Sequence, residues 1–264
     1  MNLDMVPSGT PITAPEFKLS NAPIVEAVLD VDCDMPAAFD LAGFEGKLRS
    51  AFSQQYPKFR AQYLDKYRIE WQEDQASRHS ANRAIQGFQF LQDDGKQLVQ
   101  VRAQGFSFNR LAPYRTLDEY LPEIERTWGL FVTIASPVQI RVVRLRYINR
   151  ILLPFANDRI ELQRYLKISP GLPAEDRLQF AGFLNQHAAV EVGTGHQVNI
   201  VLTSQPREND NLPVILDICV ASEEIATTEN WAWLLTKVQS LRALKNRIFR
   251  STLTEQCLTL FQQR

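Results

Sequence analysis

The hydrophobic residues of this chain change their spacing in the same order twice, and that repeated order constrains the fold more than any other feature. Within residues 24–33 every second side chain is apolar, which predicts a half-buried strand. Residues 38–56 then switch to the spacing of an amphipathic helix. Three strand-like runs follow, and a Thr116–Glu119 capping box predicts the start of a second helix. The three runs are 67–71, 87–91 and 97–108.

The order starts again at residue 139. Gln139–Leu153 predicts a long strand, and Asp158 with Glu161 predicts a capped short helix through Leu166. A long helix from about Thr228 closes the chain. Between these two helices lie three more strand-like runs, at 178–192, 196–203 and 212–221.

These patterns predict an α+β protein built by tandem duplication of a strand–helix–three strands–helix unit. We expect mostly antiparallel sheets, either two separate sheets or one curved sheet, covered by helices on one side. Residues 1–20 are predicted to be a flexible N-terminal arm. Residues 21–135 and 136–264 are predicted to be two α+β halves that share a core.

Net charge limits the kind of partner that the chain can bind. The 264 residues carry a formal charge of -1, whereas a nucleic-acid binder usually has a positive excess that neutralises phosphates. Nucleic acid therefore ranks below a protein partner, a second copy of the chain or a small anionic ligand.

The cysteines and the apolar runs predict the cellular compartment of the protein. Cys33, Cys219 and Cys257 are far apart and form no C-x-x-C pair, so neither a disulfide framework nor a zinc site is indicated. No run approaches 18 apolar residues, and residues 1–15 lack the apolar region of a signal peptide. We expect a cytoplasmic protein that does not bind a membrane.

The strand 139–153 carries a row of cations. Arg144, Arg146 and Arg150 share one face of that strand, and arginines in a row suit a carboxylate or a phosphate. Asp217 is counted with these arginines as a candidate binding residue. The simpler interpretation is a solvated face whose arginines pair with acids of neighbouring strands, such as Asp217, Glu26 or Asp30.

Two other segments are candidate binding sites. Asn109, Arg110 and Tyr114 lie where a strand turns toward a helix, a frequent place for functional loops, although asparagine is also an ordinary turn residue. The final helix carries five cations and no acid between Trp231 and Ser251, a pattern that suits an acidic partner or a phosphate backbone. The nearly neutral charge of the whole chain and the helix dipole, which favours cations late in a helix, instead favour a solvated basic face. The five are Lys237, Arg242, Lys245, Arg247 and Arg250.

No motif with a known catalytic mechanism is present. The three histidines are scattered, the glycines around Thr194 are too few for a nucleotide-binding loop, and no G-x-S-x-G occurs. We therefore predict no catalytic residue, no metal site and no cofactor.

Three segments in chain order resemble a family of bacterial proteins of uncharacterised function. They are Leu19-Ser20-Asn21-Ala22-Pro23-Ile24-Val25-Glu26-Ala27, Gly105-Phe106-Ser107-Phe108-Asn109-Arg110-Leu111-Ala112-Pro113-Tyr114 and Leu145-Arg146-Tyr147-Ile148-Asn149-Arg150-Ile151, with Leu216-Asp217-Ile218 as a weaker fourth. The family is sporadically distributed and has about this length. The resemblance implies a bacterial or prophage-type origin and implies no reaction.

The sequence thus favours a binding or regulatory protein that recognises a macromolecule or an anionic ligand through a polar sheet face. A role as an accessory in bacterial phage defence is in keeping with the resemblance. The alternative is an enzyme whose site is not recognisable in the sequence and whose substrate is phosphorylated or a nucleotide.

Overall fold

The computed structural model describes residues 19–70, 78–156, 159–168 and 180–262. Nine antiparallel strands form one continuous sheet in the order β2-β3-β4-β5-β1-β6-β9-β8-β7. The strands are β1 (Ile24–Asp34), β2 (Lys58–Glu70), β3 (Arg78–Leu91), β4 (Gln97–Arg102), β5 (Gly105–Leu111), β6 (Gln139–Pro154), β7 (Leu184–Val190), β8 (Gln197–Ser204) and β9 (Asn211–Ser222). The α+β class is confirmed, and the two expected sheets are joined into one.

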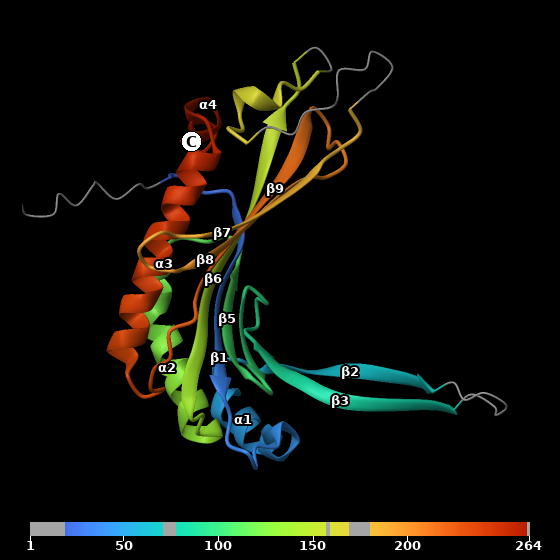
Figure 1. The fold of residues 1–264 in the computed structure, drawn as a ribbon, viewed down its shortest axis with the longest axis vertical. Helices are drawn as coiled ribbons and strands as arrows, with labels where there is room; N and C mark the ends of the chain where they lie inside the picture. The colour runs from blue at the N-terminus through green and yellow to red at the C-terminus, as the bar shows by residue number, and fades with distance from the viewer. Residues whose placement is uncertain (1–18, 71–77, 157–158, 169–179, 263–264) are drawn as a thin grey trace, which may run out of the picture.

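The helices lie mainly along one face of this sheet. The α-helices are α1 (Glu45–Phe52), α2 (Leu117–Ala135), α3 (Trp231–Thr252) and α4 (Glu255–Thr259), and the 3-10 turns are η1 (Leu41–Phe44) and η2 (Leu162–Arg164). Helix α3 packs on β6 and β9, and α2 packs on β5. Figure 1 shows both long helices on the same side of the strands. We call the sheet face that points away from α2 and α3 the outer face.

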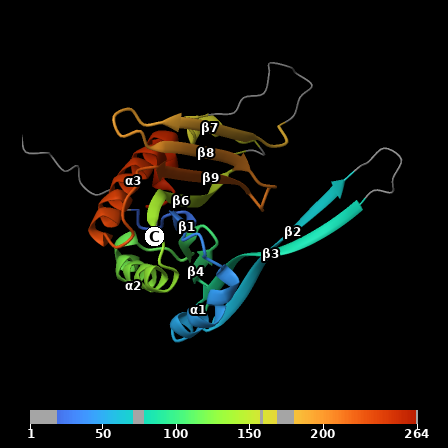
Figure 2. The ribbon, with the colours of Figure 1, turned by 60° about the horizontal axis from the view of Figure 1, so that its bottom comes forward.

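The strands β1 and β6 pair along the centre of the sheet. Alternation places Leu29 and Val31 of β1 opposite Leu145 and Val143 of β6 on the helix-covered side, where all four are buried. One hydrophobic cluster takes in buried side chains from both halves of the chain. The hairpin of β2 and β3 extends away from the rest of the molecule (Figure 2).

The predicted strand 97–108 is wrong, because the chain forms two strands there, β4 and β5, joined by a tight turn. The buried positions change phase across that turn, from Val99 and Val101 to Phe106 and Phe108. Gly105 opens β5 with φ +153, and a Cβ at this position would lie 2.1 Å from the carbonyl oxygen of Val31. Only glycine lets β5 approach β1 so closely.

Helix ends were predicted with mixed success. The Thr116 hydroxyl accepts from the amide of Glu119 at 3.4 Å and caps α2, as expected. The predicted short helix through Leu166 is wrong, because only the 3-10 turn η2 forms and its N-cap Glu161 makes no side-chain bond; Asp158 lies outside the described residues. At the chain end Thr254 caps the separate helix α4.

Candidate functional site

On the outer face Arg144 belongs to a network of two arginines and two aspartates. Its Nη1 lies 2.6 Å from an oxygen of Asp32 and 3.1 Å from one of Asp30. Arg102 of β4 bonds the same two carboxylates, at 3.0 Å to Asp32. Burial raises the pKa of Asp30 although Arg102 lowers it, and the neighbouring charge of Asp32 raises it further. Arg102 of β4 and Arg144 of β6 thus compensate the repulsion between the two neighbouring carboxylates of β1.

The other two arginines of the predicted row also have acid partners. The Nε of Arg146 lies 2.9 Å and 3.1 Å from the two oxygens of Asp217 in β9. This hydrogen bond, stronger than the opposing effect of burial, raises the pKa of Arg146. Arg150 pairs with Glu208 and donates to Gln205 at 3.1 Å. Each predicted arginine therefore already contacts an acid, as in the simpler interpretation.

The three candidates near the end of β5 separate onto opposite faces. Asn109 is on the outer face, where its Nδ2 donates to Glu26 at 2.7 Å. Arg110 points to the helix side, and its guanidinium carbon lies 5.3 Å from the ring centroid of Tyr120. Tyr114 also lies on the helix side, away from the arginine row. The seven predicted site residues therefore do not form one site.

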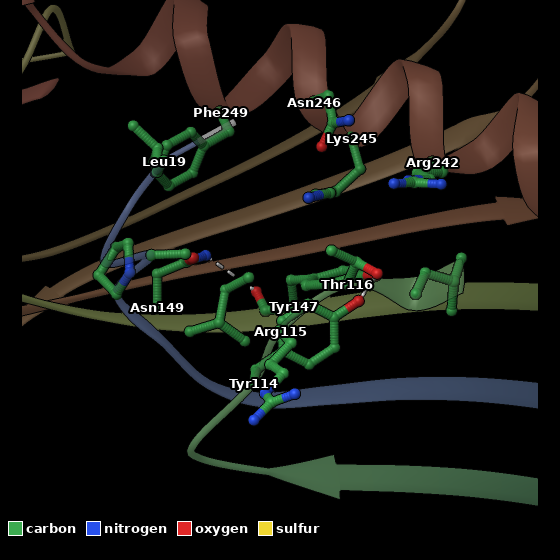
Figure 3. Close-up of a pocket in the computed structure, with 14 residues that line it drawn as sticks. Leu19, Tyr114, Arg115, Thr116, Tyr147, Asn149, Arg242, Lys245, Asn246 and Phe249 are labelled. Carbon is green, nitrogen blue, oxygen red and sulfur yellow. Dashed lines mark hydrogen bonds between the residues drawn. The ribbon is translucent and has the colours of Figure 1, made fainter. Parts of the chain in front are cut away.

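A cavity of about 160 Å³ lies between α3, the start of α2, β6 and residues 19–24. We call it the Lys245 cavity. Its polar lining residues are Tyr114, Arg115, Thr116, Tyr147, Asn149, Arg242, Lys245 and Asn246. Its apolar lining residues are Leu19, Ala22, Pro23, Ile24, Leu117 and Phe249. Figure 3 shows Lys245 reaching from α3 toward β6, the strand that carries Tyr147 and Asn149.

Backbone hydrogen bonds fix the walls of the Lys245 cavity. The carbonyl of Pro23 accepts from the amide of Arg150 in β6 at 2.8 Å. The amide of Asn21 donates to the carbonyl of Phe261 at 3.0 Å, which ties the same wall to the end of the chain. The side chain of Asn149 donates to the carbonyl of Leu216 in β9 at 2.9 Å. These bonds hold the lining residues in place without a ligand.

Lys245 is buried in this cavity without an acidic partner. Only 8% of the residue is exposed, and its ammonium has no hydrogen bond or ion pair within the described ranges of the chain. Its Nζ lies 3.9 Å from the ring centroid of Tyr147, a cation–π contact. Burial, and then the positive charge of Arg242, lower the pKa of Lys245 to about 7. Arg242 itself is 2.9 Å from both oxygens of Asp118.

Two tyrosine hydroxyls meet at the floor of the cavity. The hydroxyl oxygens of Tyr114 and Tyr147 are 2.8 Å apart. Burial raises the pKa of Tyr147 to about 12, against a smaller lowering by its bond to Tyr114. Burial also raises the pKa of Tyr114. Both hydroxyls are therefore protonated at neutral pH, and one of them has a proton to donate into the cavity.

The sequence interpretation found Tyr114 but missed Lys245, Tyr147 and Asn149 as site residues. The expectation that the last helix presents a solvated basic face is wrong for Lys245. A signal was present, because Lys245 falls four residues after Leu241 and four before Phe249, within the buried stripe of α3. A lysine at a stripe position is a buried charge that needs an explanation.

The other cations of α3 are mostly neutralised by acids of other elements. Lys237 pairs with Glu224, and Arg247 pairs with Glu191 beside the turn between β7 and β8. Together with the pair of Arg242 and Asp118, these contacts leave little uncompensated positive charge for a phosphate backbone.

The chain matches no protein-family model, and comparison with curated proteins found no significant match. Within the parts of the chain that the structure describes, no helix combines the length and the hydropathy that crossing a membrane requires. In the same parts, no three side chains of His, Cys, Asp or Glu come together as a metal site.

Proposed function

We propose that this protein binds a small organic anion in the Lys245 cavity. The observation that carries the proposal is the buried ammonium of Lys245, which lines a cavity and has no acidic partner among the described residues. A buried charge without a partner is costly. An anionic ligand supplies the missing opposite charge. Arg115 and Arg242 also line the cavity, but each lies beside an acid of α2, so Lys245 is the cation that the ligand would neutralise.

The size and walls of the cavity indicate the class of ligand. A volume of about 160 Å³ is close to that of an engineered cavity of about 150 Å³ that binds benzene. The side chains of Leu19, Ile24 and Phe249 provide an apolar part of the lining beside the cation. A monocarboxylate with a compact apolar body meets both requirements.

The outer face is the weaker candidate for an anion. Its three arginines contact Asp30, Asp32, Asp217 and Glu208, so an incoming anion has to compete with carboxylates that are already in place. Recognition of a macromolecule through this face stays a prediction from the sequence.

Calorimetric titration with benzoate at pH 6.5 tests the proposal, with benzamide as the neutral analogue. We expect benzoate to bind and benzamide not to bind, and Lys245→Met to abolish binding. The matched control is Lys237→Met, which removes the same charge from the same helix but from a lysine paired with Glu224. Equal binding of benzoate to the protein and to Lys245→Met would contradict the proposal.

We also propose that the two halves of the chain arose by tandem duplication. The strand order supports this, because β1 and β6, the first strands of the two halves, are neighbours at the centre of the sheet. Each is flanked by the last strand of its own half, β5 or β9. The cytoplasmic location and the role as a defence accessory stay predictions.

A further inference from the structure

The Lys245 cavity also has the features of a site where an amine reacts. A lysine attacks a carbonyl carbon only as the neutral amine, and burial next to another cation is a known way to keep it neutral. Only 8% of Lys245 is exposed, and Arg242 lies about one helical turn earlier on α3. Its side chain reaches into the cavity toward Tyr147 (Figure 3).

We propose that Lys245 forms a Schiff base with a small carbonyl compound that carries a carboxylate, such as a 2-oxo acid. This inference rests on the anion-binding cavity proposed above and assigns the class of ligand that occupies it. The cavity brings together a nucleophile without an ion-pair partner among the described residues, the lining arginines Arg115 and Arg242, and two hydroxyls that carry protons.

Formation of the Schiff base joins the amine nitrogen to the carbonyl carbon, releases one water molecule and takes up one proton from solvent. The Nζ lone pair of Lys245 forms a bond to the carbonyl carbon, and the electrons of the C=O double bond move to oxygen. That oxygen takes up a proton while the nitrogen loses one, which gives a carbinolamine. The C–O bond then breaks, water leaves with one further proton, and the C=N bond of a protonated imine forms. No electron is gained or lost overall.

The tyrosine pair is suited to move these protons. The two hydroxyls of Tyr114 and Tyr147 are 2.8 Å apart, so a proton given to the carbonyl oxygen from one is replaced from the other. Because the ring of Tyr147 lies under the Nζ of Lys245, it holds the amine at one wall and also stabilises the positive charge of the imine.

The test traps the imine by reduction. The protein is incubated with pyruvate or phenylglyoxylate and cyanoborohydride at pH 7, and peptide mass mapping locates the reduced adduct. An ordinary lysine is neutral in about one molecule in 2,500 at pH 7 and Lys245 in about half, so we expect labelling of Lys245 to exceed that of Lys237 by at least about 100-fold. Lys245→Arg keeps the positive charge but has no amine nucleophile, and it should lose the adduct while still binding benzoate.

The outcomes separate this inference from the proposed function. A single adduct at Lys245 that disappears in Lys245→Arg supports the Schiff base. Benzoate binding without an adduct, or with adducts spread evenly over surface lysines, overturns the Schiff base and leaves anion binding in place. Absence of both benzoate binding and the adduct overturns both.

Discussion

On the outer face of the sheet, Arg144 and Arg102 share the carboxylates of Asp30 and Asp32, whereas on the helix-covered face Lys245 has no acid partner in the described part of the chain. The arginines retain about a third of their side-chain exposure, while Lys245 is almost fully buried. The more exposed cations are compensated and the more buried one is not. The anion site proposed above would account for this difference.

Removing a charge should change the free energy of unfolding in opposite directions in the two regions. Removing one member of a paired network leaves an uncompensated charge and destabilises the fold. Removing an unpaired buried charge relieves a cost and stabilises the fold. The free energy of unfolding of single variants therefore distinguishes a paired cation from an unpaired one.

The largest effect is expected in the pH dependence of Lys245→Met. Burial, with the charge of Arg242, lowers the pKa of Lys245 from 10.5 to about 7, so between these pH values the unfolded chain binds a proton that the folded protein does not. The loss of folding stability caused by Lys245 is complete below pH 7 and disappears as the pH rises to about 10.5. We expect the variant to be more stable than the protein at pH 7, by up to about 5 kcal/mol, with the difference falling by about 1.4 kcal/mol per pH unit.

Urea denaturation at several pH values between 6 and 10 measures this difference. The other charged or titratable groups that line the cavity are Tyr114, Arg115, Tyr147 and Arg242, with Asp118 paired to Arg242, and all of them are present in both proteins. Lys237→Met serves as the control and should show no such slope. A difference that does not change with pH would show that Lys245 has an ordinary pKa.

An opposite result is expected for Asp32→Ala in the outer-face network. The side chain of Asp32 is 12% exposed and contacts both Arg102 and Arg144. Its removal leaves the two arginines with a single shared carboxylate in this network, that of Asp30. We expect a loss of about 3 kcal/mol in the free energy of unfolding. Asp34→Ala, at the end of the same strand and 39% exposed, should cost no more than about 1 kcal/mol. Similar costs for both variants would mean that the network is not a structural unit.

The smallest effect is expected for Arg146→Ala. Its side chain is 48% exposed, although its partner Asp217 is 14% exposed. The free energy of unfolding should fall by about 1 kcal/mol, and a double-mutant cycle with Asp217→Ala should give a coupling of about 0.5–1 kcal/mol. Benzoate binding in the Lys245 cavity should not change. A loss of benzoate binding in this variant would show that the ligand binds on the outer face and not in the Lys245 cavity.

Local sequence signals predicted elements more reliably than they predicted contacts. The alternation in β1 and β6 and the Thr116 cap of α2 were readable because each depends on neighbouring residues. The turn between β4 and β5 was missed although the buried residues change phase there, because only the close approach of Val31 shows why Gly105 is required. That approach is a contact between residues about 75 positions apart, which no local pattern contains.

By itself the sequence determined which side chains share a face. It placed Arg144, Arg146 and Arg150 together on one side of β6, and Tyr147 with Asn149 on the other, because side chains alternate along a strand. Which of these cations have an acid partner follows from the packing of strands and helices. The pairing of β6 with β1 and β9 brings acids to the arginines. The packing of α3 places Lys245 over the ring of Tyr147, where it forms no ion pair within the described residues. Charge compensation depends on distances across the fold, and the order of residues does not state those distances.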